Sequence, residues 1–169
     1  MDLGFGGEVA DLYHGYPAAV VDLLAEAFTL TEQDLVVDPG CGTGQLTLPV
    51  ARRVRAVVGV DPEPDMLRRA RRAARDAGVT NVPWMLGADT DLPALRAALA
   101  GAPVAAVTIG QGLHWMRRDE LFRSARGLVR PGGGVAVVTN GTPLWLQHSA
   151  WSPGLRGPAE GPSAMARTR

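Results

Sequence analysis

The sequence predicts an α/β protein in which a doubly wound parallel sheet lies between two layers of helices. Short apolar runs alternate with segments of helical periodicity along the 169 residues, the length of one ordinary domain. The apolar runs are continuous rather than alternating with polar residues, which is typical of parallel strands buried on both faces. Because crossovers between parallel strands are right-handed, the helices are expected on both faces of the sheet.

Five apolar runs are the expected strands. They cover residues 35–37, 56–60, 82–86, 104–109 and 135–139. The third run is the weakest, because Pro83 cannot donate a backbone hydrogen bond to a neighbouring strand. Pro131 and the three glycines after it predict a turn directly before the last strand.

Five segments with apolar residues at helical spacing are the expected helices. They cover residues 16–28, 45–53, 63–77, 93–100 and 117–129. The third is the clearest, with apolar residues on one side, five arginines on the other and Gly78 as a natural stop. We interpret the arginine row as a solvated face rather than a nucleic-acid patch, since no aromatic residues interleave it.

Three regions are expected along the chain. An N-terminal helical segment covers 1–30, the main α/β domain covers 31–141, and an irregular tail covers 142–169. The last eighteen residues contain three prolines, three glycines and few large apolar side chains. Such a segment cannot bury enough surface to offset its ordering entropy, so the sequence predicts a disordered tail.

Composition narrows the classes of function. The chain is 46% hydrophobic and 20% charged, with mean hydropathy +0.03. It has no apolar stretch long enough to span a membrane, and its acidic, glycine-rich first residues are not expected to act as a signal peptide. The net charge of zero gives no electrostatic reason to bind nucleic acid or an anionic membrane. All seventeen basic residues are arginine, which excludes a phosphate loop with its lysine. A single cysteine fits a cytoplasmic location.

A glycine-rich loop follows the first expected strand. Asp38 precedes three glycines at alternate positions, Gly40, Gly42 and Gly44, which allow a sharp turn and close approach of a ligand. The dinucleotide fingerprint needs glycines at relative positions 1, 3 and 6, and this loop lacks the last of them. A carboxylate at Asp38 would also repel a pyrophosphate, whereas it suits a cationic ligand. A nicotinamide-dependent oxidoreductase is therefore the less favoured alternative.

The loop resembles the D-x-G-x-G-x-G first motif of class I S-adenosylmethionine-dependent methyltransferases. The segment ending at Asp61 is similar to the second motif, whose acid accepts hydrogen bonds from the ribose hydroxyls of the cofactor. The residues after it, including Pro62 and Met66, are similar to the D-x-S-x-x-M-L pattern of the family. The resemblance thus implies that these three residues contact S-adenosyl-L-methionine.

Three later segments extend the resemblance. Residues 86–93 resemble the third motif, whose acid contacts adenine; Ala88 holds the acid position and Asp89 follows it. Asp89 is preferred over Asp91 for that contact, and both alternatives stay open. The segment 109–116, which contains Gln111, is similar to the segment after the fourth strand of the family, and 128–134 matches its L-x-P-G-G turn.

The resemblance implies a Rossmann-like, three-layer cofactor-binding domain that methylates a small molecule. The most similar branch is that of trans-aconitate and biotin-pathway methyltransferases. Only five of the seven family strands are recognisable, so we expect a chain truncated before the last two. An apolar edge at 135–139 would then favour self-association. A non-catalytic methyltransferase remnant is a further alternative.

The expected site holds the cofactor and no metal. Its cofactor-binding residues are Asp38, Gly40, Cys41, Gly42, Gly44, Asp61, Pro62, Met66, Ala88, Asp89 and Gln111. His114 is the candidate general base because it follows the fourth strand, and packing on Trp115 is the alternative interpretation of this histidine. Cys41 is expected as a small loop residue rather than a nucleophile.

Overall fold

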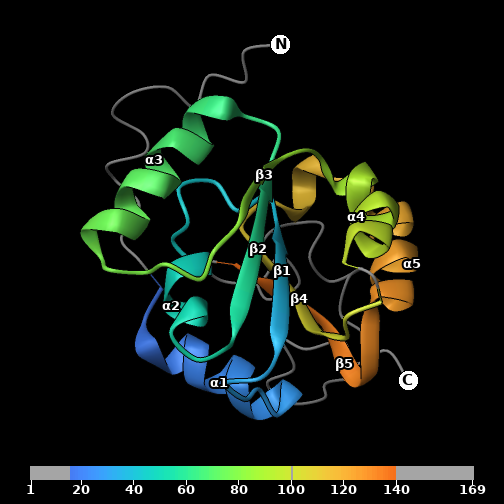
Figure 1. The fold of residues 1–169 in the computed structure, drawn as a ribbon. Helices are drawn as coiled ribbons and strands as arrows, with labels where there is room; N and C mark the ends of the chain where they lie inside the picture. Colours follow the sequence, from blue (N-terminus) through green and yellow to red (C-terminus); the bar gives the residue numbers. More distant parts are fainter. Residues whose placement is uncertain (1–15, 100, 140–169) are drawn as a thin grey trace, which may run out of the picture.

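The computed structural model describes residues 16–99 and 101–139. They form a five-stranded sheet of order β3-β2-β1-β4-β5, and all four strand pairings are parallel. The strands are β1 (Leu35–Pro39), β2 (Ala56–Asp61), β3 (Trp84–Leu86), β4 (Val104–Gly110) and β5 (Val129–Val138). The predicted doubly wound α/β fold is confirmed (Figure 1). Residues 1–15 of the predicted N-terminal segment 1–30 and the predicted tail 142–169 lie outside the described residues.

Helices cover both faces of the sheet. They are α1 (Ala18–Phe28), α2 (Thr47–Ala51), α3 (Pro64–Asp76), α4 (Leu92–Ala98) and α5 (Arg118–Leu128). In Figure 1, α1, α2 and α3 lie on one side of the sheet, and α4 and α5 lie on the other. None of the helices in the described part of the chain is long and apolar enough to cross a membrane.

Two apolar cores fill the spaces between the three layers. Val36 of β1 belongs to the core under α1 and α2, whereas its neighbour Val37 belongs to the core under α4 and α5. Val57 and Val58 of β2 divide in the same way. Successive side chains of a strand point to opposite faces, so continuous apolar runs place one residue in each core in turn.

The helix predicted over 45–53 is shorter than expected. It begins at Thr47 and ends at Ala51, because the glycine loop occupies the residues before it. Gly44 has φ +86°, outside the helical region, and its N–H donates to the carbonyl of Cys41 at 2.9 Å within the loop. The long loop leaves room for only a short helix between β1 and β2.

The predicted glycine turn before the fifth strand is wrong in its placement. The strand β5 begins at Val129, which pairs with Val104, and the next pair joins Ala106 to Gly134. The intervening residues form a bulge inside the strand rather than a turn before it. Gly133 fits there because a Cβ atom on it would lie 2.5 Å from the carbonyl oxygen of Ala105.

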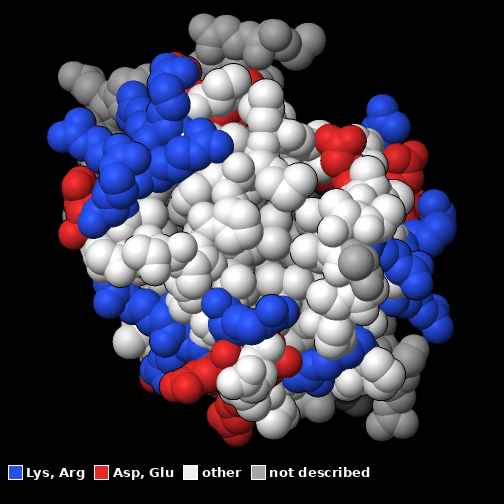
Figure 2. All heavy atoms as spheres, viewed as in Figure 1, with Lys and Arg blue, Asp and Glu red and all other residues white. Residues whose placement is uncertain are grey.

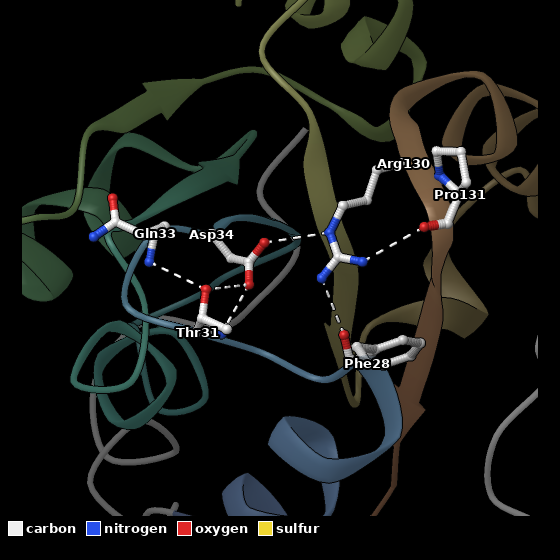
Figure 3. A network of polar contacts seen from close by, with 6 residues as sticks. All are labelled: Phe28, Thr31, Gln33, Asp34, Arg130 and Pro131. Atoms are coloured by element: carbon white, nitrogen blue, oxygen red, sulfur yellow. Dashed lines mark hydrogen bonds and ion pairs between the residues drawn. The ribbon is translucent and has the colours of Figure 1, made fainter.

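A polar network joins three segments at the amino ends of the strands (Figure 3). Arg130 donates from Nε to Oδ1 of Asp34 at 3.3 Å and from Nη2 to the carbonyl of Phe28 at 3.2 Å. Thr31 donates from its backbone N–H and its hydroxyl to Oδ2 of Asp34, at 2.7 and 2.9 Å. The end of α1, the start of β1 and the bulge of β5 are therefore held together.

Candidate functional site

A cavity of about 290 Å³ lies where the carboxyl ends of β1, β2 and β4 meet. The chain leaves β1 toward β2 on one side, and β4 lies on the other, so the cavity is at the point where the strand order reverses. Ligands of open α/β sheets bind at this position. Ten predicted cofactor residues line the cavity: Asp38, Gly40, Cys41, Gly42, Asp61, Pro62, Met66, Ala88, Asp89 and Gln111. Their roles in binding remain predictions.

The glycine loop forms one wall of the cavity. Gly40, Gly42 and Gly44 have φ angles of +68°, +54° and +86°, which L side chains rarely adopt. No atom lies within 4 Å of a Cβ atom built on Gly42, so this part of the loop faces open space. Gly44 is the one predicted cofactor residue outside the lining. A Cβ atom there would lie 2.9 Å from the indole ring of Trp84, so Gly44 is needed for packing beneath the loop.

Asp61 fixes the loop from the end of β2. Its carboxylate is 6% exposed, and Oδ2 accepts a hydrogen bond of 2.8 Å from the N–H of Gly42. Oδ1 accepts one of 2.9 Å from the N–H of Glu63, directly before α3. Each carboxylate oxygen has a second lone pair, so Asp61 can still accept hydrogen bonds from hydroxyl groups in the cavity.

Asp38 lies beneath the loop at the end of β1. Thr47 donates its hydroxyl to Oδ2 of Asp38 at 2.5 Å, and Thr108 donates its hydroxyl to Oδ1 at 3.1 Å. Burial raises the pKa of Asp38 to about 7; the two hydroxyl hydrogen bonds oppose this shift, and the negative charge of Asp61 adds to it. A cation in the cavity would favour the ionised form of this carboxyl.

The two threonines were not predicted as part of the site. Thr108 has 0% exposure, and it is a polar residue within the otherwise apolar run of β4. A hydroxyl in a buried strand needs a hydrogen-bond partner. The carboxylate of Asp38, at the end of the neighbouring strand β1, is that partner. The polar break in the run 104–109 is therefore the signal that could have revealed it.

Gln111 combines a strained backbone with an unsatisfied side chain. Its φ of +62° lies in the left-handed region, and its N–H donates to the carbonyl of Val138 at 2.9 Å. Within residues 16–99 and 101–139, the buried Nε2 of Gln111 is the side-chain polar atom without a hydrogen-bond partner. Gln111 also lines the cavity, and a strained backbone together with an unsatisfied buried amide is typical of ligand-binding sites.

His114 and Trp115 border the cavity from the short helix η3 (Leu113–Trp115). Their ring centroids are 4.8 Å apart with an interplanar angle of 47°. Both side chains are exposed, and Trp115 is 61% exposed. The histidine thus packs on the tryptophan and also reaches the cavity, so its predicted role as a base stays a prediction.

Only one of the two candidate adenine-binding acids faces the cavity. Asp91 lies outside the lining, and its Oδ2 accepts the N–H of Ala88 at 2.8 Å. Asp89 lines the cavity, and its Oδ2 accepts the N–H of Arg117 at 2.9 Å. The geometry therefore favours Asp89 over Asp91 for a ligand contact.

Cys41 is buried in the glycine loop, near Asp38 and Asp61. Burial, with the charges of Asp38 and Asp61, raises the pKa of its thiol well above the usual range. Such a thiol is a poor nucleophile at neutral pH. Within the described residues, no group of three or more His, Cys, Asp or Glu side chains is placed to hold a metal ion.

Sequence reasoning missed Tyr16, Glu63 and Met116 as lining residues. The hydroxyl of Tyr16 lies so close to Gly110 that a Cβ atom there would be 2.7 Å away from it. No local pattern marks Tyr16, because it reaches the cavity only through the packing of α1 against the sheet. Glu63 is the second residue after Asp61 and could have been included with its neighbour Pro62.

Comparison with known proteins identifies the family of the chain. A model of the methyltransferase domain family matches residues 36–133, from β1 into the bulge of β5. The chain therefore belongs to the methyltransferase domain family, in its S-adenosylmethionine-dependent class I. The resemblance of the glycine loop is confirmed by this match.

The individual relatives agree with the family. An uncharacterized methyltransferase of Mycobacterium tuberculosis is 32% identical over 143 residues, which are 83% of this chain and 53% of that protein. The chain thus spans about half the length of the curated relative. A precorrin 8w decarboxylase of Methanobacterium thermoautotrophicum has a similar structure, with a TM-score of 0.61, 26% identity, and coverage of 76% of this chain and 66% of the other. A geranyl diphosphate methyltransferase in complex with S-adenosylmethionine has a TM-score of 0.60 at 23% identity, covering 82% and 55%, and it shows the shared fold.

Proposed function

We propose that the chain binds S-adenosyl-L-methionine in the cavity at β1, β2 and β4 and transfers its methyl group to a small-molecule acceptor. The observation that carries this proposal is the pair of buried carboxylates, Asp38 and Asp61, beneath an open glycine loop. A sulfonium and an ammonium group suit such a pair, whereas a phosphate does not. Membership of the family supports the same cofactor.

The lining residues fit the parts of this cofactor. Asp61 has free lone pairs for the two ribose hydroxyls, and Asp89 and Met66 also line the cavity. Gln111 lines the cavity with an unsatisfied amide, and the open space at Gly42 admits the ligand close to the backbone. When bound, the cofactor would supply a methyl group on a sulfonium: an acceptor lone pair attacks the methyl carbon, and the C–S bond breaks to leave a thioether.

The protein's own contribution to this reaction is alignment and a site shielded from water. Trp115 and Tyr16 border the cavity and shield part of it. His114 takes a proton if the acceptor is a hydroxyl that must lose one before attack. An acceptor that is already a free amine or a carboxylate needs no such base, so activity does not require a catalytic pair.

Isothermal titration calorimetry with S-adenosylhomocysteine and with NAD tests the proposal on the chain as it is. We expect binding of S-adenosylhomocysteine and none of NAD, whose pyrophosphate would meet the acidic loop. Binding of NAD alone would favour the oxidoreductase alternative. Binding of S-adenosylhomocysteine without methyl transfer to any acceptor would favour the non-catalytic alternative. The proposal includes a cytoplasmic location, supported by the single, unpaired Cys41.

A further inference from the structure

The charge of the cavity points to the class of acceptor, provided that the proposed methyl transfer holds. Four acidic side chains line the cavity: Asp38, Asp61, Glu63 and Asp89. No arginine of the described residues lines it, and the sequence has no lysine. A site that recognises a carboxylate or phosphate group needs a cationic partner for it, most often arginine.

The arginines of the described chain are placed elsewhere. Five of them lie exposed along α3, where Figure 2 shows them gathered on the outside of the molecule. Arg117, the arginine that directly follows the lining residue Met116, directs its side chain toward Glu120 at 3.4 Å. Arg130 binds Asp34 and Phe28 at the amino ends of the strands, away from the cavity. Arg71 of α3 donates to the carbonyl of Trp84 at 3.2 Å and does not line the cavity, although its charge acts on Cys41. No described arginine therefore lines the cavity to bind an anionic acceptor.

Aromatic rings, in contrast, border the cavity next to β4. Tyr16 lies against Gly110 at the end of β4, and His114 and Trp115 follow that strand directly. The acids proposed to contact adenosine lie on the other side of β1, because Asp61 ends β2 and Asp89 follows β3. The side of the cavity left for an acceptor is therefore the aromatic one.

We propose that the acceptor is a planar molecule without negative charge, recognised between the aromatic side chains at the end of β4 and favoured when it carries an amine. Aromatic faces attract both planar rings and cations. The acidic lining attracts a cation and repels a carboxylate. This acceptor class differs from aconitate, a tricarboxylate, which the resemblance to trans-aconitate methyltransferases would suggest.

Three probes of matched shape test the proposal: tyramine, tyrosol and 4-hydroxyphenylacetate, which carry an ammonium, a hydroxyl and a carboxylate on the same phenol. Their binding is measured by tryptophan fluorescence in the presence of saturating S-adenosylhomocysteine. We expect tyramine to bind about tenfold or more tightly than 4-hydroxyphenylacetate, with tyrosol between them. Added salt should narrow the difference, because it screens exposed charges.

Substitutions at His114 separate charge from shape. His114→Arg places a guanidinium beside Trp115 and should reduce the preference for tyramine at least tenfold. His114→Gln is the matched control, since it removes the imidazole without adding charge, and it should keep the order of the three probes. Equal or tighter binding of 4-hydroxyphenylacetate by the unchanged chain overturns the proposal, as does the failure of all three probes to bind. Calorimetry with S-adenosylhomocysteine is run first, so that a failure of cofactor binding is seen separately.

Discussion

The N–H of Gly42 donates a hydrogen bond of 2.8 Å to Oδ2 of Asp61, although 19 residues separate them in the chain. This hydrogen bond joins the glycine loop after β1 to the acid at the end of β2. Asp61→Ala removes this acceptor and the expected ribose contact together. We expect binding of S-adenosylhomocysteine to weaken by about 1.5–3 kcal/mol, the range for hydrogen bonds to a charged group.

Calorimetry on Asp61→Ala, Asp61→Asn and Asp65→Ala checks this expectation. Asp61→Asn keeps one acceptor oxygen and should lose less affinity than the alanine variant. Asp65 lies exposed in the first turn of α3 and outside the cavity, so Asp65→Ala should bind normally. Unchanged affinity in a folded Asp61→Ala variant would remove the ribose role.

Two glycines with similar backbones separate strain from binding. Gly42 and Gly78 have φ of +54° and +66°, and no atom lies within 4 Å of a Cβ atom built on either. Alanine at each position should cost a similar free energy of unfolding, about 1–2 kcal/mol. Only Gly42→Ala should also weaken S-adenosylhomocysteine binding, because Gly78 ends α3 away from the cavity. If Gly42→Ala bound S-adenosylhomocysteine as tightly as Gly78→Ala does, the glycine loop would not hold the ligand.

The pKa of Asp38 predicts a pH dependence of stability. Burial raises it from 3.8 to about 7, so between about pH 4 and 7 the folded chain holds a proton that the unfolded chain has lost. The free energy of unfolding should therefore fall as pH rises through this window, by at most about 1.4 kcal/mol per pH unit for one proton. Asp38→Asn should remove this slope.

Urea unfolding at several pH values gives the slope for the unchanged chain, Asp38→Asn and Asp76→Asn. Asp76 is an exposed acid at the end of α3, and its substitution should leave the slope as it is. The difference between the two variants isolates Asp38 from the other carboxyl groups. If Asp38→Asn and the unchanged chain showed the same slope of unfolding free energy against pH, the carboxyl of Asp38 would be ionised across this pH range.

Arg130 should matter for stability and not for the site. Its side chain is 25% exposed and bonds to Asp34 and to the end of α1. We expect Arg130→Gln to lower the free energy of unfolding by about 1–3 kcal/mol. The substitution removes the cationic partner of Asp34 and the hydrogen-bond donor to the carbonyl of Phe28. Arg126→Gln, at an exposed position of α5, should change it little. S-adenosylhomocysteine affinity should be the same in both, because the network lies at the opposite ends of the strands.

The edge strand β5 predicts association. It pairs with β4 on one side, and within the described residues no strand pairs with its other side. Val135, Val137 and Val138 carry no charge that would discourage pairing with another chain. We expect light scattering coupled to gel filtration to show a mass that rises with protein concentration. A monomer mass at every concentration, with a melting temperature above about 65 °C, would show that the protein is stable without association through β5.

Sequence patterns predicted those parts of the protein that depend on local chemistry. Continuous apolar runs gave the strands, and the positions of Asp38 and Asp61 at strand ends placed them in one cavity. Features that depend on contacts between distant segments were not predictable. The bulge in β5 depends on the carbonyl of Ala105, and Gly44 is required by Trp84 of β3. Tyr16 reaches the cavity only because α1 packs on the sheet.

The reactivity of Cys41 toward thiol reagents depends on how often the glycine loop opens. The sequence has one cysteine, and its thiol is buried in the loop with a raised pKa. Thiol reagents attack the thiolate, so this buried thiol with its raised pKa is labelled slowly, and local opening of the loop speeds the labelling. The rate of labelling under native conditions therefore measures how often the loop opens. A ligand that closes over the loop will protect the thiol in proportion to its occupancy, which reports binding at this position without any substitution.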